Sequence, residues 1–76
     1  MRLPESYVAR FQPVIDRING WYIVTIRRRG TCIVSPAGHL MSRHKSVAAA
    51  VKVARMSPAP GPVTATRHAI VEACLQ

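Results

Sequence analysis

Acidic residues are scarce in this chain of 76 residues, because only Glu5, Asp16 and Glu72 carry carboxylates. No two of them lie at the spacing of one helix face or one strand face, so the sequence offers no carboxylate pair for general acid–base catalysis. A glycine-rich phosphate loop and a nucleophile elbow are also missing. We therefore expect no catalytic residues and predict that the protein is not an enzyme.

Cysteine and histidine are equally sparse. Cys32 and Cys74 are the only thiols, and with His39, His44 and His68 they match no spacing typical of metal ligands. We expect no metal and no cofactor. Both cysteines sit in apolar runs, which favours buried free thiols and a cytoplasmic location. The one enzymatic alternative is a nucleophilic pair of Cys32 with a nearby histidine.

Long apolar runs are missing as well. The N-terminal stretch MRLPESYVARF has no apolar segment of the length found in a signal peptide. No run approaches the roughly 20 apolar residues that a membrane-spanning helix needs. The sequence therefore predicts a cytoplasmic protein without a membrane partner.

Positive charge is what the chain has in excess. Eleven lysines and arginines give a net charge of +8 and a pI near 11.2, and all but Lys45 and Lys52 are arginine. The arginine fork suits phosphates and carboxylates, and a domain this basic attracts polyanions. DNA or RNA is the expected partner. The alternatives are an acidic protein surface and a generic solvated surface.

Residues 3–18 allow two interpretations. Apolar residues recur at helical spacing along one stripe: Leu3, Tyr7, Phe11, Val14 and Ile18. This favours an N-terminal helical segment, with Asn19-Gly20 as its C-cap. The same Asn19-Gly20 pair is also a strong hairpin signal, which would make the segment before it a strand.

The centre of the chain predicts a three-stranded antiparallel meander packed on a helix, over residues 21–56. Strands are expected at 21–26, 31–35 and 39–43, because β-branched and aromatic residues alternate between turns rich in Gly and Pro. Ser46 is the expected N-cap of the following helix. The fold class is therefore α+β, in a single small domain.

A proline-rich linker at 57–62 separates this unit from a C-terminal helix at 64–75. Thr64 or Thr66 is its expected cap. Its apolar side packs either on the sheet or on a second copy, so the helix is also a candidate homodimer contact.

Strand alternation suggests where a polyanion would bind. Tyr22, Val24 and Ile26 are expected to face the helix, which leaves the other face of the strand as an exposed platform. A stacking ring and nearby arginines suit nucleic acid. Trp21 has an alternative place in the core. The expected nucleic-acid-binding residues are Trp21, Thr25, Arg27, Arg28, Arg29, Arg43 and Lys45.

Residues 20–56 (GWYIVTIRRRGTCIVSPAGHLMSRHKSVAAAVKVARM) resemble small DNA-binding modules of three strands and a helix, found at the amino terminus of phage integrases and in plant AP2-like factors. The helix start there has the form Ser/Thr-x-x-x-Ala, here Ser46 to Ala50. The resemblance implies a sheet in the major groove, contacted by Trp21, Thr25, Arg27 and Arg29.

The chain as a whole is similar to small accessory proteins of phages and plasmids. That similarity implies an alternative function: inhibition of a host enzyme or defence complex by protein–protein binding, in the manner of anti-CRISPR proteins. A chain of charge +8 would then cover an acidic surface.

Overall fold

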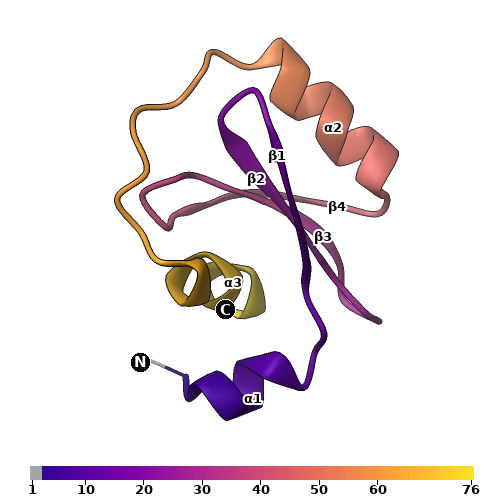
Figure 1. Ribbon diagram of the computed structural model, residues 1–76. Coiled ribbons are helices and arrows are strands. Elements are labelled where there is room, and N and C mark those ends of the chain that lie inside the picture. Colours follow the sequence, from indigo (N-terminus) through magenta and orange to yellow (C-terminus); the bar gives the residue numbers. More distant parts are fainter. Residues whose placement is uncertain (1–2) are drawn as a thin grey trace.

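The computed structural model describes residues 3–76, which form an α+β fold (Figure 1). The elements in chain order are α1 (Glu5–Ala9), β1 (Val14–Ile18), β2 (Trp21–Ile26), β3 (Gly30–Val34), β4 (Leu40–His44), α2 (Val47–Met56) and α3 (Arg67–Leu75). The strands make one antiparallel sheet in the order β1-β2-β3-β4. The predicted class is confirmed, but the sheet has four strands rather than three.

The additional strand is β1, so the helical interpretation of residues 3–18 is wrong beyond the first turns. Gln12 is left-handed, with φ of 47°, and Pro13 has no N–H, so a helix cannot continue through this point. β1 pairs with β2, with Ile15 opposite Val24, and Asn19 and Gly20 close the hairpin at φ of 51° and 84°. The apolar stripe thus came from two consecutive elements.

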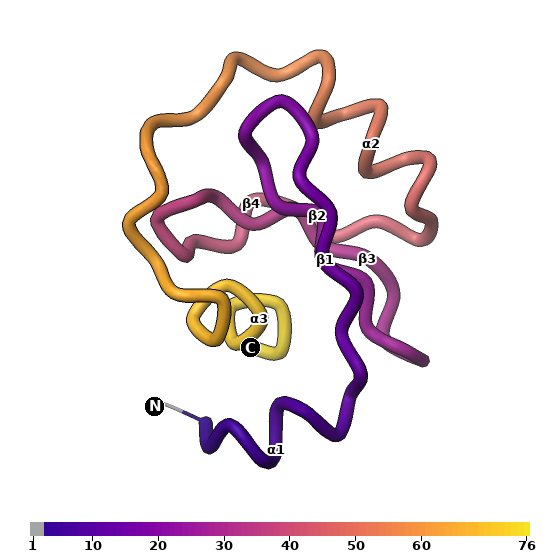
Figure 2. Tube along the Cα trace, in the orientation of Figure 1, coloured from indigo at the N-terminus to yellow at the C-terminus, as the bar shows by residue number. Residues whose placement is uncertain are grey.

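Helices cover both faces of the sheet (Figures 1 and 2). On one face α3 and α1 close over a buried cluster of Val8, Val24, Ile26, Cys32, Val34, Ile70, Val71 and Cys74. On the other face Ala50 and Ala54 of α2 pack against Ile23 and Ile33 of the sheet. The face of Val24 and Ile26 was predicted to pack on the helix after Ser46, but it packs on α3. That correction follows from α3 returning across the linker to the sheet.

The two longer helices have side-chain caps. The Ser46 hydroxyl accepts a hydrogen bond from the Ala49 N–H at 3.2 Å, and the Thr66 hydroxyl accepts one from the Ala69 N–H at 3.1 Å. The predicted cap at Ser46 is confirmed, and α3 begins after Thr66 rather than at residue 64. None of the helices within residues 3–76 has the length and apolar character needed to cross a bilayer.

The linker after α2 is fixed to the β1–β2 turn. The Asn19 side-chain amide donates to the carbonyl oxygens of Ala54, at 3.1 Å, and of Ser57, at 2.8 Å. The Trp21 indole N–H donates to the Pro58 carbonyl at 3.2 Å. We call these residues, Asn19, Trp21, Ala54, Ser57 and Pro58, the linker end. Asn19 therefore caps the last turn of a helix that lies 35 residues further along the chain.

The start of the described chain is clamped to α3. The Leu3 N–H donates to the Glu72 carboxylate, and the ring Nε2 of His68 hydrogen-bonds the Leu3 carbonyl oxygen at 2.7 Å. His68 and Glu72 also lie within 3.7 Å of each other, one helical turn apart. This clamp, together with the buried Val8, holds α1 beside α3.

Candidate nucleic-acid interface

The β2–β3 turn carries three consecutive exposed arginines. It is closed by a hydrogen bond of 2.9 Å from the Arg29 N–H to the Ile26 carbonyl oxygen, and Ile26 pairs with Gly30. Arg28 has φ of 68°, in the left-handed region that turns normally fill with Gly or Asn. The turn thus holds a bulky charged residue in a strained conformation at the tip of a hairpin.

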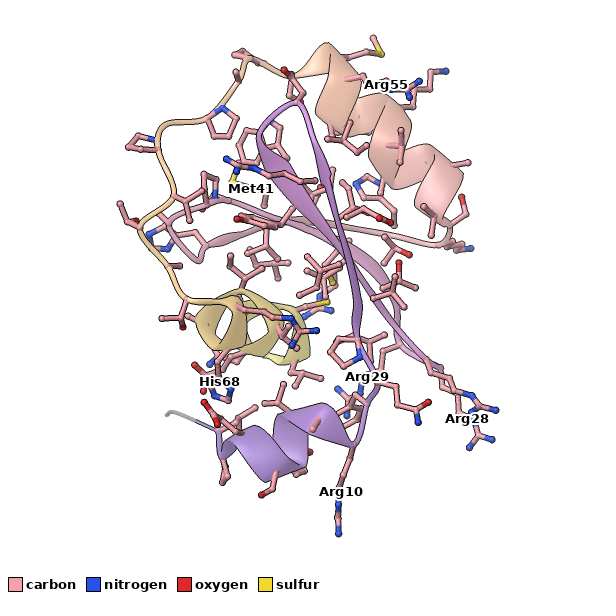
Figure 3. The ribbon with its side chains drawn as sticks, in the orientation of Figure 1. Arg10, Arg28, Arg29, Met41, Arg55 and His68 are labelled. Carbon is pink, nitrogen blue, oxygen red and sulfur yellow. The ribbon has the colours of Figure 1, made fainter. Side chains whose placement is uncertain are left out.

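A surface hollow of about 350 Å³ lies between this turn and the end of α1. Its lining combines three arginines with a half-buried ring and an amide: Arg10, Phe11, Gln12, Arg27 and Arg28. Figure 3 shows Arg10 and Arg28 pointing outward from the end of α1 and from the tip of the hairpin. Gln12 and Arg28 are two of the three non-glycine residues with positive φ within residues 3–76. The hollow is therefore bordered by both of these strained positions.

Arg29 is held on the inner side of the turn. Its guanidinium lies over the Phe11 ring, 4.9 Å from the ring centroid. The edge-on contact of Tyr7 with Phe11, at 5.2 Å between centroids and 72° between planes, engages the same ring. This stack ties the hairpin tip to α1.

Lys45 lies at the same end of the sheet. A Cβ placed on Gly30 would lie 3.1 Å from the His44 carbonyl oxygen, so the strand end that precedes Lys45 is packed against the β2–β3 turn. We call the set Arg10, Arg27, Arg28, Arg29 and Lys45 the basic end. The capped N-terminus of α2 follows at once, and its dipole adds positive potential there.

The charge of the basic end is not neutralised within the fold. In the described part of the chain, the side chains of Arg10, Arg27 and Arg28 make no hydrogen bond or ion pair. None of the acids lies in the turn or the hollow, since Glu5 begins α1, Asp16 is central in β1 and Glu72 is on α3. Several exposed positive charges are therefore free to meet an external anion.

Two other predicted site residues, Trp21 and Thr25, are half-buried and are not part of the basic end. Trp21 begins β2 while Arg27 follows its end, a separation of about 20 Å along the strand. Trp21 is half-buried against the Ile23 and Ile33 cluster at the linker end. Thr25 is half-buried too, with its hydroxyl 3.3 Å from that of Thr31. The structure brings the arginine turn and Lys45 together, and separates them from the ring.

Arg43 points to the face covered by α3. Its guanidinium donates to the Cys32 sulfur at 3.3 Å and to the Gln76 carbonyl oxygen at 2.8 Å. Arg43 is therefore committed to holding the end of α3 against the sheet, and its charge is not part of the basic end.

Sequence reasoning missed Arg10, Phe11 and Gln12. They lie between α1 and β1, and the pairing of Val14 with Thr25 places them beside the end of β2, while the clamp between Leu3 and α3 holds α1 in place. That contact joins residues 69 positions apart, and no local pattern encodes it. The break at Gln12-Pro13 was the available signal that the chain turns there.

The two thiols are buried neighbours without a histidine partner. Burial raises the pKa of Cys74 to about 12, the adjacent Cys32 thiol raises it too, and the charges of Arg43 and Arg29 oppose this. The Cys74 thiol therefore stays protonated at neutral pH. Cys32 and His44 project from opposite faces of the sheet, because Cys32 pairs with Arg43 and His44 pairs with Thr31. The pair of Cys32 with His44 that sequence allowed is not formed.

Comparisons of the chain with protein-family models, with curated protein sequences and with solved structures return no match. The functional argument therefore rests on the chemistry and geometry of the basic end.

Proposed function

We propose that the protein is a non-enzymatic nucleic-acid-binding domain that holds its ligand through the basic end. The observation that carries the proposal is the group of arginines around the hollow, Arg10, Arg27 and Arg28, which have no carboxylate partner among residues 3–76. Arginine forks match phosphate oxygens in geometry and charge, and phosphate contacts supply most non-specific affinity for nucleic acid.

The energetics of the turn support the same function. Three consecutive arginines repel one another, and the left-handed Arg28 adds a strain of about 1 kcal/mol. Neither cost is offset by a hydrogen bond or ion pair of Arg27 or Arg28 inside the described chain. A bound phosphate would lower the repulsion among the arginines. The turn would therefore be more stable with a bound anion than without one.

A second candidate function is the coverage of an acidic surface on a host protein, as an inhibitor or adaptor. The observation that favours it is an exposed apolar strip beside β4 and α2, where Met41, Val53 and Met56 are 55%, 39% and 77% exposed. Met41 and Val53 line a hollow of about 110 Å³, and Lys52 and Arg55 are exposed on the same helix. Apolar anchors with a charged rim are typical of protein interfaces.

A salt titration separates the two. We expect the parent to bind a labelled DNA duplex with a linear fall of log affinity against log salt, between about 50 and 300 mM. The variant Arg27→Ala, Arg28→Ala, Arg29→Ala should lose about 2 from that slope, since Arg29 is engaged with Phe11, and should bind much more weakly. Fluorescence anisotropy measures both.

The matched control removes the same charge elsewhere, through Lys52→Ala, Arg55→Ala and Arg67→Ala, all exposed and outside the basic end. It should keep most of the parental affinity and slope. Equal losses in the two triple variants would mean that the charge acts generically, and would reject the basic end as the site. A parent that fails to bind nucleic acid would leave the host-protein candidate.

A further inference from the structure

The aromatic rings decide which kind of nucleic acid the basic end can take. Proteins that bind single strands without sequence preference combine a basic groove with exposed aromatic faces on which unpaired bases stack. The chain has four aromatic residues: Tyr7, Phe11, Trp21 and Tyr22. A site for single strands would therefore need at least one of these rings to present a free face near the arginines.

The ring nearest the arginines is already engaged. Phe11 lines the hollow but is half-buried, with the Arg29 guanidinium over its face and the Tyr7 ring in edge-on contact. Tyr7 is 40% exposed, yet it is held by that same contact. A base could reach the face of Phe11 only by displacing Arg29, and so by giving up one of the charges that attract the strand.

The remaining two rings are engaged away from the basic end. Tyr22 packs against the core under α3, and the Arg17 guanidinium lies 5.2 Å from its ring centroid. Trp21 packs under α2, and its indole N–H is bonded to Pro58 at the linker end. Each of the four rings thus has a partner among residues 3–76, and the ring that lines the hollow, Phe11, has a guanidinium over its face.

Binding of a double helix does not require aromatic side chains for base stacking. Its bases are stacked on one another, and its phosphates present one charge per about 1.7 Å of axis, twice the density of a single strand. The β2–β3 turn lies at one end of the four-stranded sheet, where its exposed arginines can reach the phosphates that border a groove. The basic end offers what this ligand needs, which is a projecting tip with several unpaired arginines.

We infer that the basic end binds double-stranded nucleic acid through its phosphate backbone, without stacking on unpaired bases. This inference rests on the proposed function and narrows it to one substrate class. Arg10, Arg27 and Arg28 contact phosphate oxygens, and Gln12 adds an amide donor in the same hollow. DNA and RNA duplexes share this chemistry, and the experiment includes both.

The test titrates the full chain into four labelled 20-mers at several salt concentrations: a DNA duplex, an RNA duplex and an unstructured single strand of each. We expect at least one duplex to bind about tenfold or more tightly than its single strand, with a log–log salt slope of about −3 for three neutralised phosphates. The duplex that binds more tightly shows whether the ligand is DNA or RNA.

Failure of the inference and failure of the proposed function give different results. Single strands that bind as tightly as both duplexes, with loss in the Arg27–Arg29 triple variant, overturn the duplex assignment and leave nucleic-acid binding intact. Absence of binding to all four ligands overturns both.

The fluorescence of Trp21, the only tryptophan, is a second readout on the same samples. Its intensity should stay constant through the titration with the duplex, because the ring lies at the other end of β2. Strong quenching by a single strand would reveal base stacking on the indole and contradict the inference.

Discussion

The two turns that flank β2 are built alike and used differently. Each contains a non-glycine residue in the left-handed region, Asn19 with φ of 51° and Arg28 with φ of 68°. Asn19 is suited to that conformation, and its amide bonds two carbonyl oxygens at the end of α2 and the start of the linker. Arg28 is poorly suited to it, and its side chain makes no hydrogen bond or ion pair to another residue of 3–76.

The two turns differ in whether contacts within the fold offset their backbone strain. At the linker end, the strain of the turn is offset by capping and by packing of Gly20 on Pro60. At the basic end nothing in the described chain offsets it. Strain that persists without a structural gain is typical of functional positions. The first turn therefore has a structural role in the fold, and the second is the turn for which we propose ligand binding.

The largest effect should come from breaking the linker end. Asn19→Ala removes two hydrogen bonds to carbonyl oxygens and places alanine in the left-handed region. We expect the free energy of unfolding to fall by about 2–3 kcal/mol. Urea denaturation followed by the fluorescence of Trp21 measures it.

The matched change at the basic end is Arg28→Ala, which places the same residue in the other left-handed position. It removes no hydrogen bond or ion pair of the described fold, so its stability should stay within about 0.5 kcal/mol of the parent. If Asn19→Ala and Arg28→Ala lowered the free energy of unfolding equally, the proposed difference between the two turns would be wrong.

A second pair of variants sharpens the comparison at Arg28 itself. Arg28→Ala and Arg28→Gly remove the same charge, but only glycine relieves the strain of a φ of 68°. Both should lower the salt slope of duplex binding by about 1. Arg28→Gly should be as stable as Arg28→Ala or more stable, by up to about 1 kcal/mol, since relief of strain competes with the entropy of glycine. Parental affinity in both variants would show that Arg28 does not contact the ligand.

The sequence predicted those elements whose signals are local. The alternating run at 21–26 became β2, and Ser46 became the cap of α2. β1 was expected only as the alternative that the Asn19-Gly20 hairpin signal offered, because Val14 and Ile18 also continue the helical spacing of Phe11.

The candidate site divides in the same way. Arg27–Arg29 are visible as a run in the sequence, whereas the hollow also needs β1 to pair with β2 and α1 to dock on α3. The coverage of both sheet faces also depends on α3 returning after the linker. Contacts across so many residues arise from tertiary packing, which overrides local pattern.

The smallest effect on duplex affinity is expected from Trp21→Phe, which tests the platform that the sequence suggested. Phenylalanine keeps an aromatic ring but cannot donate to the Pro58 carbonyl, so stability should fall by about 1 kcal/mol. Duplex affinity should not change, because residue 21 lies about 20 Å along β2 from the arginine turn. Anisotropy with the DNA duplex and thermal unfolding of the same samples give the two values. A loss of affinity that exceeds the loss expected from unfolding would place the ring in the interface, and would return the binding surface from the hairpin tip to the sheet.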